Sequence, residues 1–193
     1  MPEVDELATI ECPARIATVK IDGGSVEAIG CPEGEGYEKH VKGRSRLALL
    51  DASGKQIDEV EVSDDPYAMV KVEVEDLYGD QRPVFMVTVT VPTMGSWGGP
   101  TTTPYQIEGA HLRPILVNGN GKKLELTSAI KITWWTKPAR SGHGKDIYKI
   151  VTTIQGTDEG TRYSFEDGKW VAHKGTLKNW TGEHLSNTEA EFP

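Results

Sequence analysis

The chain contains few cysteines, few aromatic residues and no long apolar run. Only two of its 193 residues are cysteine, and aromatic residues make up 7%. No apolar stretch approaches the ~20 residues of a membrane-spanning helix. No stretch repeats its apolar residues with the 3.6-residue period of a helix, and no signal-like segment opens the chain. We therefore expect few or no long helices and no membrane span.

Motifs of catalysis and metal binding are also scarce. Ser96 lies in Gly95-Ser96-Trp97-Gly98, which differs from the Gly-x-Ser-x-Gly nucleophile elbow. The five histidines are scattered and lack the spacing of zinc ligands. These absences favour a protein that is not an enzyme and that holds no metal ion or other cofactor.

Glycine and proline are plentiful, with 21 and 11 residues, and they separate short apolar runs. Two of the turns that we predict between these runs are Asp51-Ala52-Ser53-Gly54 and Glu166-Asp167-Gly168. Runs of this kind predict a mainly β fold of antiparallel sheets, either a sandwich or propeller-like. We expect one β-rich domain over residues 1–193, with 183–193 as a frayed tail. The expected strands are Thr9–Ile21, Leu47–Leu50, Ile57–Val62, Met69–Val74, Val84–Val91, Tyr105–Ile107, Leu112–Val117, Leu124–Leu126, Ile130–Trp135, Ile147–Ile154, Tyr163–Phe165 and Lys169–Val171.

The two cysteines, Cys12 and Cys31, flank the turn signal Asp22-Gly23-Gly24. A hairpin at this turn would bring them together, and closing such a loop is worth about 3 kcal/mol in the chain-entropy model. Disulfides persist in oxidising compartments, so the pair predicts a periplasmic or secreted protein whose start, Met1-Pro2-Glu3, replaces a removed signal peptide. Two reduced cysteines in a cytosolic protein are the alternative.

The segment Gln56–Asp80 holds nine carboxylates against one base, Lys71, and so has the net charge of the whole chain, −8. Within Val60–Val62 and Val70–Val74 the acids alternate with valines, which on strands would place the carboxylates on one face. Such a face orients a basic protein partner, although a merely solvated surface has the same pattern. The acids that we expect to contact the partner are Glu59, Glu61, Glu73 and Glu75.

A basic flank lies between His111 and Lys149, where eight lysines and arginines stand against two acids. The acidic and basic flanks could also face each other as neighbouring strands, which would be a structural role. The acidic balance of the whole chain argues against nucleic acid as a ligand, because phosphate binding needs clustered bases in excess.

The segment Val91–Tyr105 is the best candidate for a binding loop. It is long and rich in glycine, and it contains a tryptophan and a tyrosine, residues that are typical anchors of protein interfaces. The alternative is that Trp97 folds back over the end of a sheet. The expected contact residues of this loop are Ser96, Trp97, Gly98, Gly99, Thr101, Thr102, Thr103 and Tyr105.

The segment Asp76–Val84 resembles the calcium loop of FG-GAP-type propeller blades. Asp76, Gly79 and Asp80 match that pattern, whereas Tyr78, Gln81 and Val84 replace an oxygen ligand, the turn glycine and the closing aspartate. Calcium needs six to eight oxygens, which two carboxylates do not supply. The resemblance therefore implies a turn of the same shape without its metal.

Residues 70–116 resemble periplasmic β-proteins that inhibit lysozymes or give immunity to secreted cell-wall hydrolases. The similarity rests on the Asp-rich turn, the Ser/Gly/Tyr-bearing loop and Leu112-Arg113-Pro114-Ile115. It implies that Ser96, Gly98, Gly99 and Tyr105 enter the hydrolase cleft.

The resemblance and the acidic segment together predict an exported binding protein that blocks a basic cell-wall-degrading toxin. One alternative is a carbohydrate- or surface-binding module that stacks sugars on Trp97, Trp134, Trp135 and Tyr105. A structural subunit of an envelope or secretion assembly is another.

We predict that Cys12 and Cys31 form a disulfide, because a hairpin at residues 22–24 places them opposite each other. Mass spectrometry of the unreduced protein should show a mass lower by two hydrogens than that of the reduced protein. Two free thiols after air oxidation would contradict both the bond and the exported location.

Overall fold

The computed structural model describes residues 13–31, 44–65, 68–91, 99–119, 121–129, 132–152 and 158–176. Within these ranges the protein is all β, with fifteen strands and no helix, so the predicted mainly β fold is confirmed. It follows that the described ranges contain no helix that could cross a membrane.

The strands form three sheets. Sheet 1 consists of β1 (Ala14–Ile21), β2 (Gly24–Gly30), β3 (Ser45–Asp51) and β4 (Gln56–Ser63). Sheet 2 consists of β5 (Met69–Glu75), β6 (Val84–Thr90), β7 (Thr101–Glu108), β8 (His111–Pro114) and β11 (Leu126–Thr127). Sheet 3 consists of β9 (Leu116–Val117), β10 (Lys122–Lys123), β12 (Ile132–Pro138), β13 (Lys145–Thr152), β14 (Asp158–Glu166) and β15 (Lys169–Thr176).

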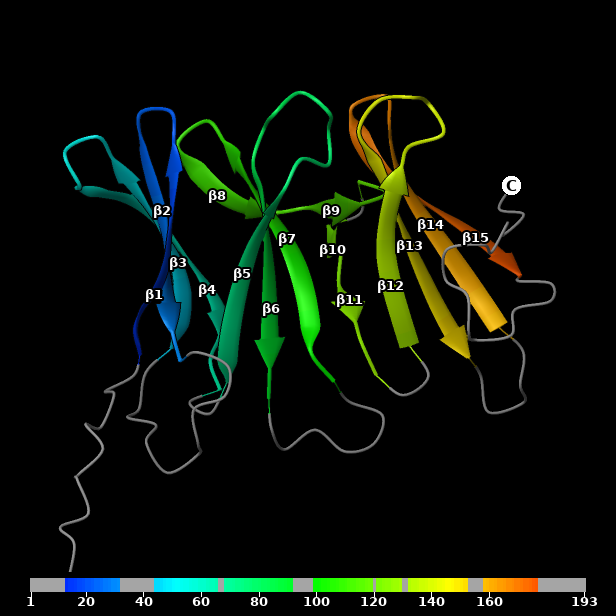
Figure 1. Ribbon diagram of the computed structural model, residues 1–193, viewed down its shortest axis with the longest axis horizontal. Coiled ribbons are helices and arrows are strands. Elements are labelled where there is room, and N and C mark those ends of the chain that lie inside the picture. The colour runs from blue at the N-terminus through cyan, green and yellow to red at the C-terminus, as the bar shows by residue number, and fades with distance from the viewer. Residues whose placement is uncertain are drawn as a thin grey trace, which may run out of the picture.

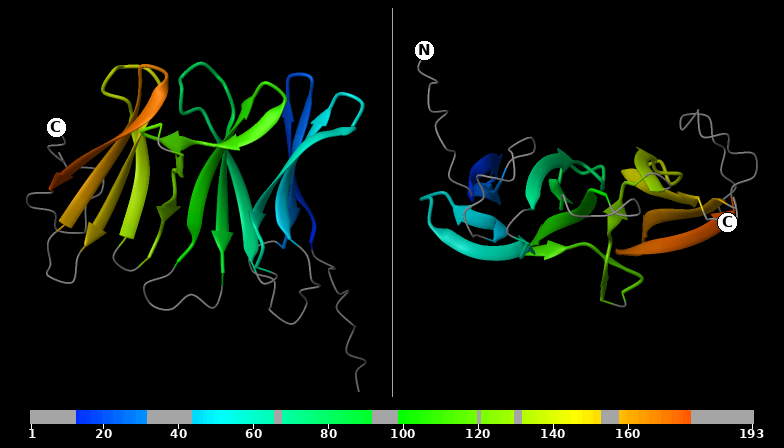
Figure 2. Two further views of the ribbon diagram at one scale, coloured as in Figure 1. Left: turned by 180° about the vertical axis from the view of Figure 1, so that it is seen from behind. Right: turned by 90° about the horizontal axis from the view of Figure 1, so that it is seen from below.

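Each sheet is built around four consecutive antiparallel strands: β1–β4, β5–β8 and β12–β15. The three sheets follow one another along the long axis of the molecule (Figure 1). Seen from below, the first strand of each group lies on one side of the molecule and the last strand on the other (Figure 2). The sheets are thus stacked like the blades of a propeller, with sheet 2 in the middle.

Turn residues explain where the strands reverse. Asp51 accepts hydrogen bonds from the backbone N–H groups of Ser53 and Lys55, at 2.9 and 3.0 Å, which closes the predicted turn between β3 and β4. The predicted turn between β14 and β15 has Asp167 and Gly168 at φ +48° and +79°, as a tight hairpin requires.

The stretch Leu112–Val117 differs from its prediction, because it is two strands rather than one. Its first part, β8, pairs with β7 of sheet 2, and its last part, β9, joins sheet 3. Ile115 lies between them, fully buried, and its N–H donates to the carbonyl of Pro104 at 2.9 Å. The chain passes from sheet 2 to sheet 3 here, because Leu112 at one end of this apolar run pairs with β7 and Val117 at the other end pairs with β15.

Two hydrophobic cores hold the sheets together. The first core lies between sheets 1 and 2 and contains Val26, Ala28, Leu47, Leu49, Val70, Phe85, Val87, Tyr105 and Leu112. The second lies between sheets 2 and 3 and contains Leu77, Tyr78, Val84, Met86, Ile115, Val117, Leu124, Leu126, Ile147 and Trp170.

Strand β6 contributes to both cores. Phe85 and Val87 point into the first core, whereas Val84 and Met86 point into the second, and all four are at most 3% exposed. Alternate residues of a strand face opposite sides of its sheet, so a strand that is covered on both sides has a continuous apolar sequence. This is the physical reason for the run Val84–Val87.

Replacing Phe85 by alanine should lower the free energy of unfolding by about 3–5 kcal/mol, because a fully buried phenyl ring leaves a cavity. Denaturant unfolding measures this loss. Phe165→Ala is the matched control, since the Phe165 side chain is 39% exposed and its removal should cost clearly less. Equal losses for the two variants would contradict the central position of β6.

Candidate functional site

The predicted binding loop is described only in its last part. Ser96, Trp97 and Gly98 lie outside the described residues, so their expected role stays a prediction. Gly99 is described, and its backbone approaches the protein's own chain: a Cβ at this position would lie 1.7 Å from the carbonyl oxygen of Ser128. Next to it, the N–H of Ser128 donates to the carbonyl of Pro100 at 2.8 Å. The close approach at Gly99 thus accompanies the pairing of β7 with β11.

The remaining loop residues belong to a strand, which corrects their assignment. Thr101, Thr102, Thr103 and Tyr105 all lie in β7. Tyr105 is 3% exposed and forms part of the first core, so it is not an exposed anchor. Thr102 is equally buried, and its hydroxyl bonds to that of Thr88 at 2.8 Å across the sheet. The apolar core between sheets 1 and 2 explains why this tyrosine is there.

The predicted acidic face is divided into two surfaces. On β4 the glutamates are exposed and Val60 and Val62 pack on the first core, as the alternation predicts. On β5 Val70 and Val72 pack on that same core. Since the two strands face one core from opposite sides, Glu59 and Glu61 point away from Glu73 and Glu75. The expectation of a single carboxylate face is therefore wrong.

Most of these carboxylates lie beside bases. Glu59 and Glu61 pair with Arg46 and Arg44 of the neighbouring β3 region, at 3.0 and 2.8 Å. Glu73 pairs with Lys71 at 2.9 Å, and Glu75 pairs with Lys145 of the basic flank. Such exposed pairs contribute about 0–1 kcal/mol each. Their arrangement means that part of the acidic segment is neutralised locally.

The turn that resembles a calcium loop is held by its own hydrogen bonds. The carboxylate of Asp76 accepts from the N–H groups of Gly79 and Gln81, at 2.7 and 3.1 Å. Asp80 accepts from Nε of Arg82 at 2.6 Å. Gln81 has φ +67°, the left-handed conformation that the glycine of the family pattern would adopt without strain. Within the described residues no group of three or more potential metal ligands gathers.

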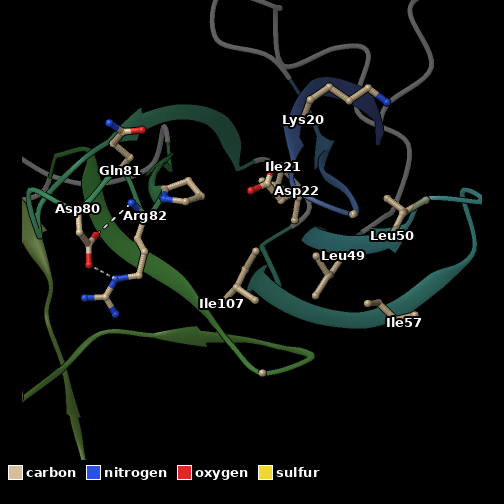
Figure 3. Close-up of a pocket in the computed structure, with 13 residues that line it drawn as sticks. Lys20, Ile21, Asp22, Leu49, Leu50, Ile57, Asp80, Gln81, Arg82 and Ile107 are labelled. Atoms are coloured by element: carbon tan, nitrogen blue, oxygen red, sulfur yellow. Dashed lines mark hydrogen bonds and ion pairs between the residues drawn. The ribbon is translucent and has the colours of Figure 1, made fainter.

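This turn forms one wall of a groove between sheets 1 and 2, which we call the rim groove. The groove has a volume of about 690 Å³. Figure 3 shows the ion-paired Asp80 and Arg82 on one side and the aliphatic side chains of sheet 1 on the other. Its lining residues are Lys20, Ile21, Asp22, Gly23, Leu49, Leu50, Ile57, Asp80, Gln81, Arg82, Pro83, Ile107 and Gly109.

The rim groove combines an open apolar surface with fixed polar walls. Ile57 is 46% exposed, although it lies on a strand with a well-packed opposite face. Gln81 stores backbone strain on the opposite wall, and strained residues gather at functional sites. An apolar hollow with a few fixed polar groups is suited to bind the side chains of a partner rather than to perform chemistry.

Comparison with family models, with curated proteins and with solved structures gave no match. A role for the rim groove therefore follows only from its shape and its lining residues.

A second groove, of about 420 Å³, lies on the other side of the same turn, between sheets 2 and 3. Tyr78, Phe165 and Trp170 line it, and the ring centroids of Tyr78 and Phe165 are 4.7 Å apart. The hydroxyl of Tyr78 accepts from Nε1 of Trp170 at 3.1 Å and donates to Gln106. Burial raises the pKa of the Tyr78 hydroxyl. Sequence reasoning missed this groove, although the aromatic residue inside the turn was a signal.

Trp134 and Trp135, two of the residues proposed as a sugar platform, do not lie on one surface, and Trp97 lies outside the described residues. Trp134 packs against the second core, whereas Trp135 stacks on Tyr148 with the ring centroids 5.7 Å apart. Adjacent strand residues point to opposite faces of the sheet, so the two indoles cannot present a common surface.

A serine, a histidine and a glutamate meet on β14 and β15, but not in the geometry of a catalytic triad. Nε2 of His173 lies 3.0 Å from the Ser164 hydroxyl and 2.8 Å from the Glu166 carboxylate. A triad histidine uses one ring nitrogen for the nucleophile and the other for the acid. Here both partners share one nitrogen. The hydrogen bond from Ser164 and the nearby His173 lower the pKa of Glu166, which is consistent with a stabilising network.

Of the two cysteines in the predicted disulfide, the structure describes only Cys31. The β1–β2 hairpin is confirmed and pairs Ala14 with Gly30, next to the two cysteines in sequence. Cys31 is 4% exposed, and its carbonyl accepts from the N–H of Val70 at 2.8 Å. Cys12 lies outside the described residues, so the bond stays a prediction.

Asp58 fastens sheet 1 to β8 beside the rim groove. Its carboxylate accepts from the N–H of Leu112 at 2.7 Å and lies 3.5 Å from Nδ1 of His111. The hydrogen bond from Leu112 lowers the pKa of Asp58, with a smaller contribution from His111. A carboxyl with a lowered pKa stabilises the fold above its ordinary pKa, near 3.9, and this stabilisation is lost as the pH falls through the folded-state value.

Asp58→Asn should therefore lower the melting temperature by a few degrees at pH 7. The difference between wild type and variant should shrink as the pH is lowered below about 4, because wild-type Asp58 then becomes protonated. Thermal melts between pH 7 and pH 2 test this. A difference that stays constant over the whole range would show that the charge of Asp58 does not matter.

Proposed function

We propose that this chain is a binding protein that receives a projecting segment of a partner protein in the rim groove. The observation that carries the proposal is the aliphatic surface of the exposed Ile57 and the half-buried Leu50, beside strained and ion-paired residues of the opposite wall. Side chains fixed in this way do not have to be ordered on binding, so less of the binding energy is lost to entropy.

The charge of the chain supports a basic partner. The acidic segment Gln56–Asp80 begins on one wall of the groove, at β4, and ends on the other, at Asp80. The local ion pairs reduce the field of this segment, but the chain as a whole has a net charge of −8. An excess of one charge sign raises the association rate with an oppositely charged protein.

In its more specific form, the proposal is that the protein is exported and inhibits a basic cell-wall-degrading toxin or lysozyme-like hydrolase. Such hydrolases are often basic because their substrate polymer is anionic, so an acidic protein with an apolar groove is complementary to them. The predicted disulfide supports an oxidising compartment. The resemblance of residues 70–116 to periplasmic inhibitors points in the same direction.

The test measures inhibition of a basic lysozyme, whose activity is recorded as the clearing of a cell-wall suspension. Wild-type protein should inhibit, and Ile57→Lys should weaken inhibition at least tenfold, because the new charge fills the groove and repels a basic partner. Val74→Lys is the matched control: Val74 is also an aliphatic strand residue with 46% exposure, but it lies outside the groove.

Melting temperatures of both variants should stay close to that of the wild type, since both side chains are exposed. Absence of inhibition by wild-type protein would contradict the proposed inhibitor function. Equal weakening by the two variants would show that net charge acts without the groove, and would reject the rim groove as the interface.

A further inference from the structure

The lysines of the basic flank do not line the rim groove, and three of them gather with Lys174 on sheet 3. Lys122 and Lys123 of β10, Lys149 of β13 and Lys174 of β15 line a hollow of about 330 Å³. A neighbouring hollow of about 560 Å³ shares Lys149 and Lys174 with it. We call this continuous depression the lysine groove.

The positive charge of the lysine groove is only weakly compensated. The carboxylates that line it are Glu125 and Glu159. In the described part of the chain, neither Lys149 nor Lys174 has a carboxylate oxygen within 4.0 Å, and the same holds for Lys123. The ammonium group of Lys149 donates instead to the backbone carbonyl of Glu125 at 3.3 Å.

Lys149 shows the electrostatic consequence. Burial lowers the pKa of its ammonium group, and the nearby charge of Lys122 lowers it further. A positive charge in this position is therefore less stable than in water, and a bound anion would relieve both effects. This lysine cluster differs from Arg15, Arg44 and Arg46 in the region of sheet 1, each of which pairs with a carboxylate at 2.8–3.0 Å.

The uncharged lining favours a ligand with a ring and hydroxyl groups over a bare ion. Tyr163 is partly buried against the second core and lines both hollows. The hydroxyls of Thr127 and Thr161 and the amide of Asn118 lie along the same surface. Aromatic faces pack against the apolar face of a sugar ring, and small polar side chains bond to its hydroxyls.

We propose that the lysine groove binds an anionic oligosaccharide, with its sulfate or carboxylate groups on Lys149 and Lys174 and a sugar ring against Tyr163. The two joined hollows offer room for more than one sugar unit. This site is built from sheet 3 together with the chain from Leu124 to Thr127, whereas the rim groove is lined by other residues of sheets 1 and 2, so either site can fail its test without the other.

Calorimetry on the full chain tests the proposal with three hexasaccharides: one sulfated, one containing uronates and one neutral. We expect the anionic sugars to bind at low salt, the neutral sugar to bind at least tenfold more weakly, and the affinity to fall as salt is raised. The anionic sugar that binds more tightly shows whether the groove prefers sulfate or carboxylate groups.

The double variant Lys149→Met/Lys174→Gln should lose at least tenfold in affinity for the anionic sugars. The control Lys55→Gln/Lys169→Gln removes the same charge from exposed positions outside the lysine groove and should lose less than threefold. If the double variant fails to fold, the single variant Lys174→Gln decides the test. Lys174 is exposed, so this variant should fold, and its affinity for the anionic sugars should fall at least threefold.

Three results would overturn the proposal. The first is equal binding of neutral and anionic sugars, or of neither. The second is an equal loss in the control variant, which would mean nonspecific attraction. The third is tighter binding of a single-stranded oligonucleotide of equal charge, which would assign the lysine groove to a different class of ligand.

Discussion

The structure depends on the burial of sheet 2 from both sides. Strand β6 supplies Phe85 and Val87 to one core and Val84 and Met86 to the other. Sheets 1 and 3 pack on opposite faces of this sheet and follow one another along the molecule (Figure 1). Because twisted sheets cannot stay in contact along their whole length, their ends diverge and leave grooves at the rim. The rim groove and the second groove, which Tyr78, Phe165 and Trp170 line, are therefore products of the same packing.

The turn between β5 and β6 connects these two grooves. Its Asp80 and Arg82 line the rim groove, while Tyr78 points to the opposite side and bonds to Trp170. Gly79 fixes the turn against sheet 3, because a Cβ there would lie 2.5 Å from the backbone nitrogen of Gly144. A turn that is held on one side by sheet 3 and closed internally by Asp76 gives the rim groove a rigid wall.

Charge is distributed by sheet rather than by sequence segment. The acids of β4 are matched by arginines from the β3 region, and Glu75 of β5 is matched by Lys145 of β13. In the described part of the chain, Lys123, Lys149 and Lys174 of sheet 3 have no carboxylate oxygen within 4.0 Å. The two proposals follow this division, with a protein interface at the rim groove and an anion site at the lysine groove.

The sequence by itself determined the β class, most strands and the turns at Asp51 and Asp167, because these depend on alternation and on the preferences of single residues. It also predicted that Val60, Val62, Val70 and Val72 pack inward, whereas Val74 of the same pattern is 46% exposed. Only the tertiary structure decided that those valines meet in one core, so that the glutamates face apart and Tyr105 is buried. Local periodicity defines the two faces of a strand, but which sheet covers each face depends on contacts between residues far apart in the chain. For the same reason the rim groove and the lysine groove, whose walls come from separate strands, could not be read from the sequence.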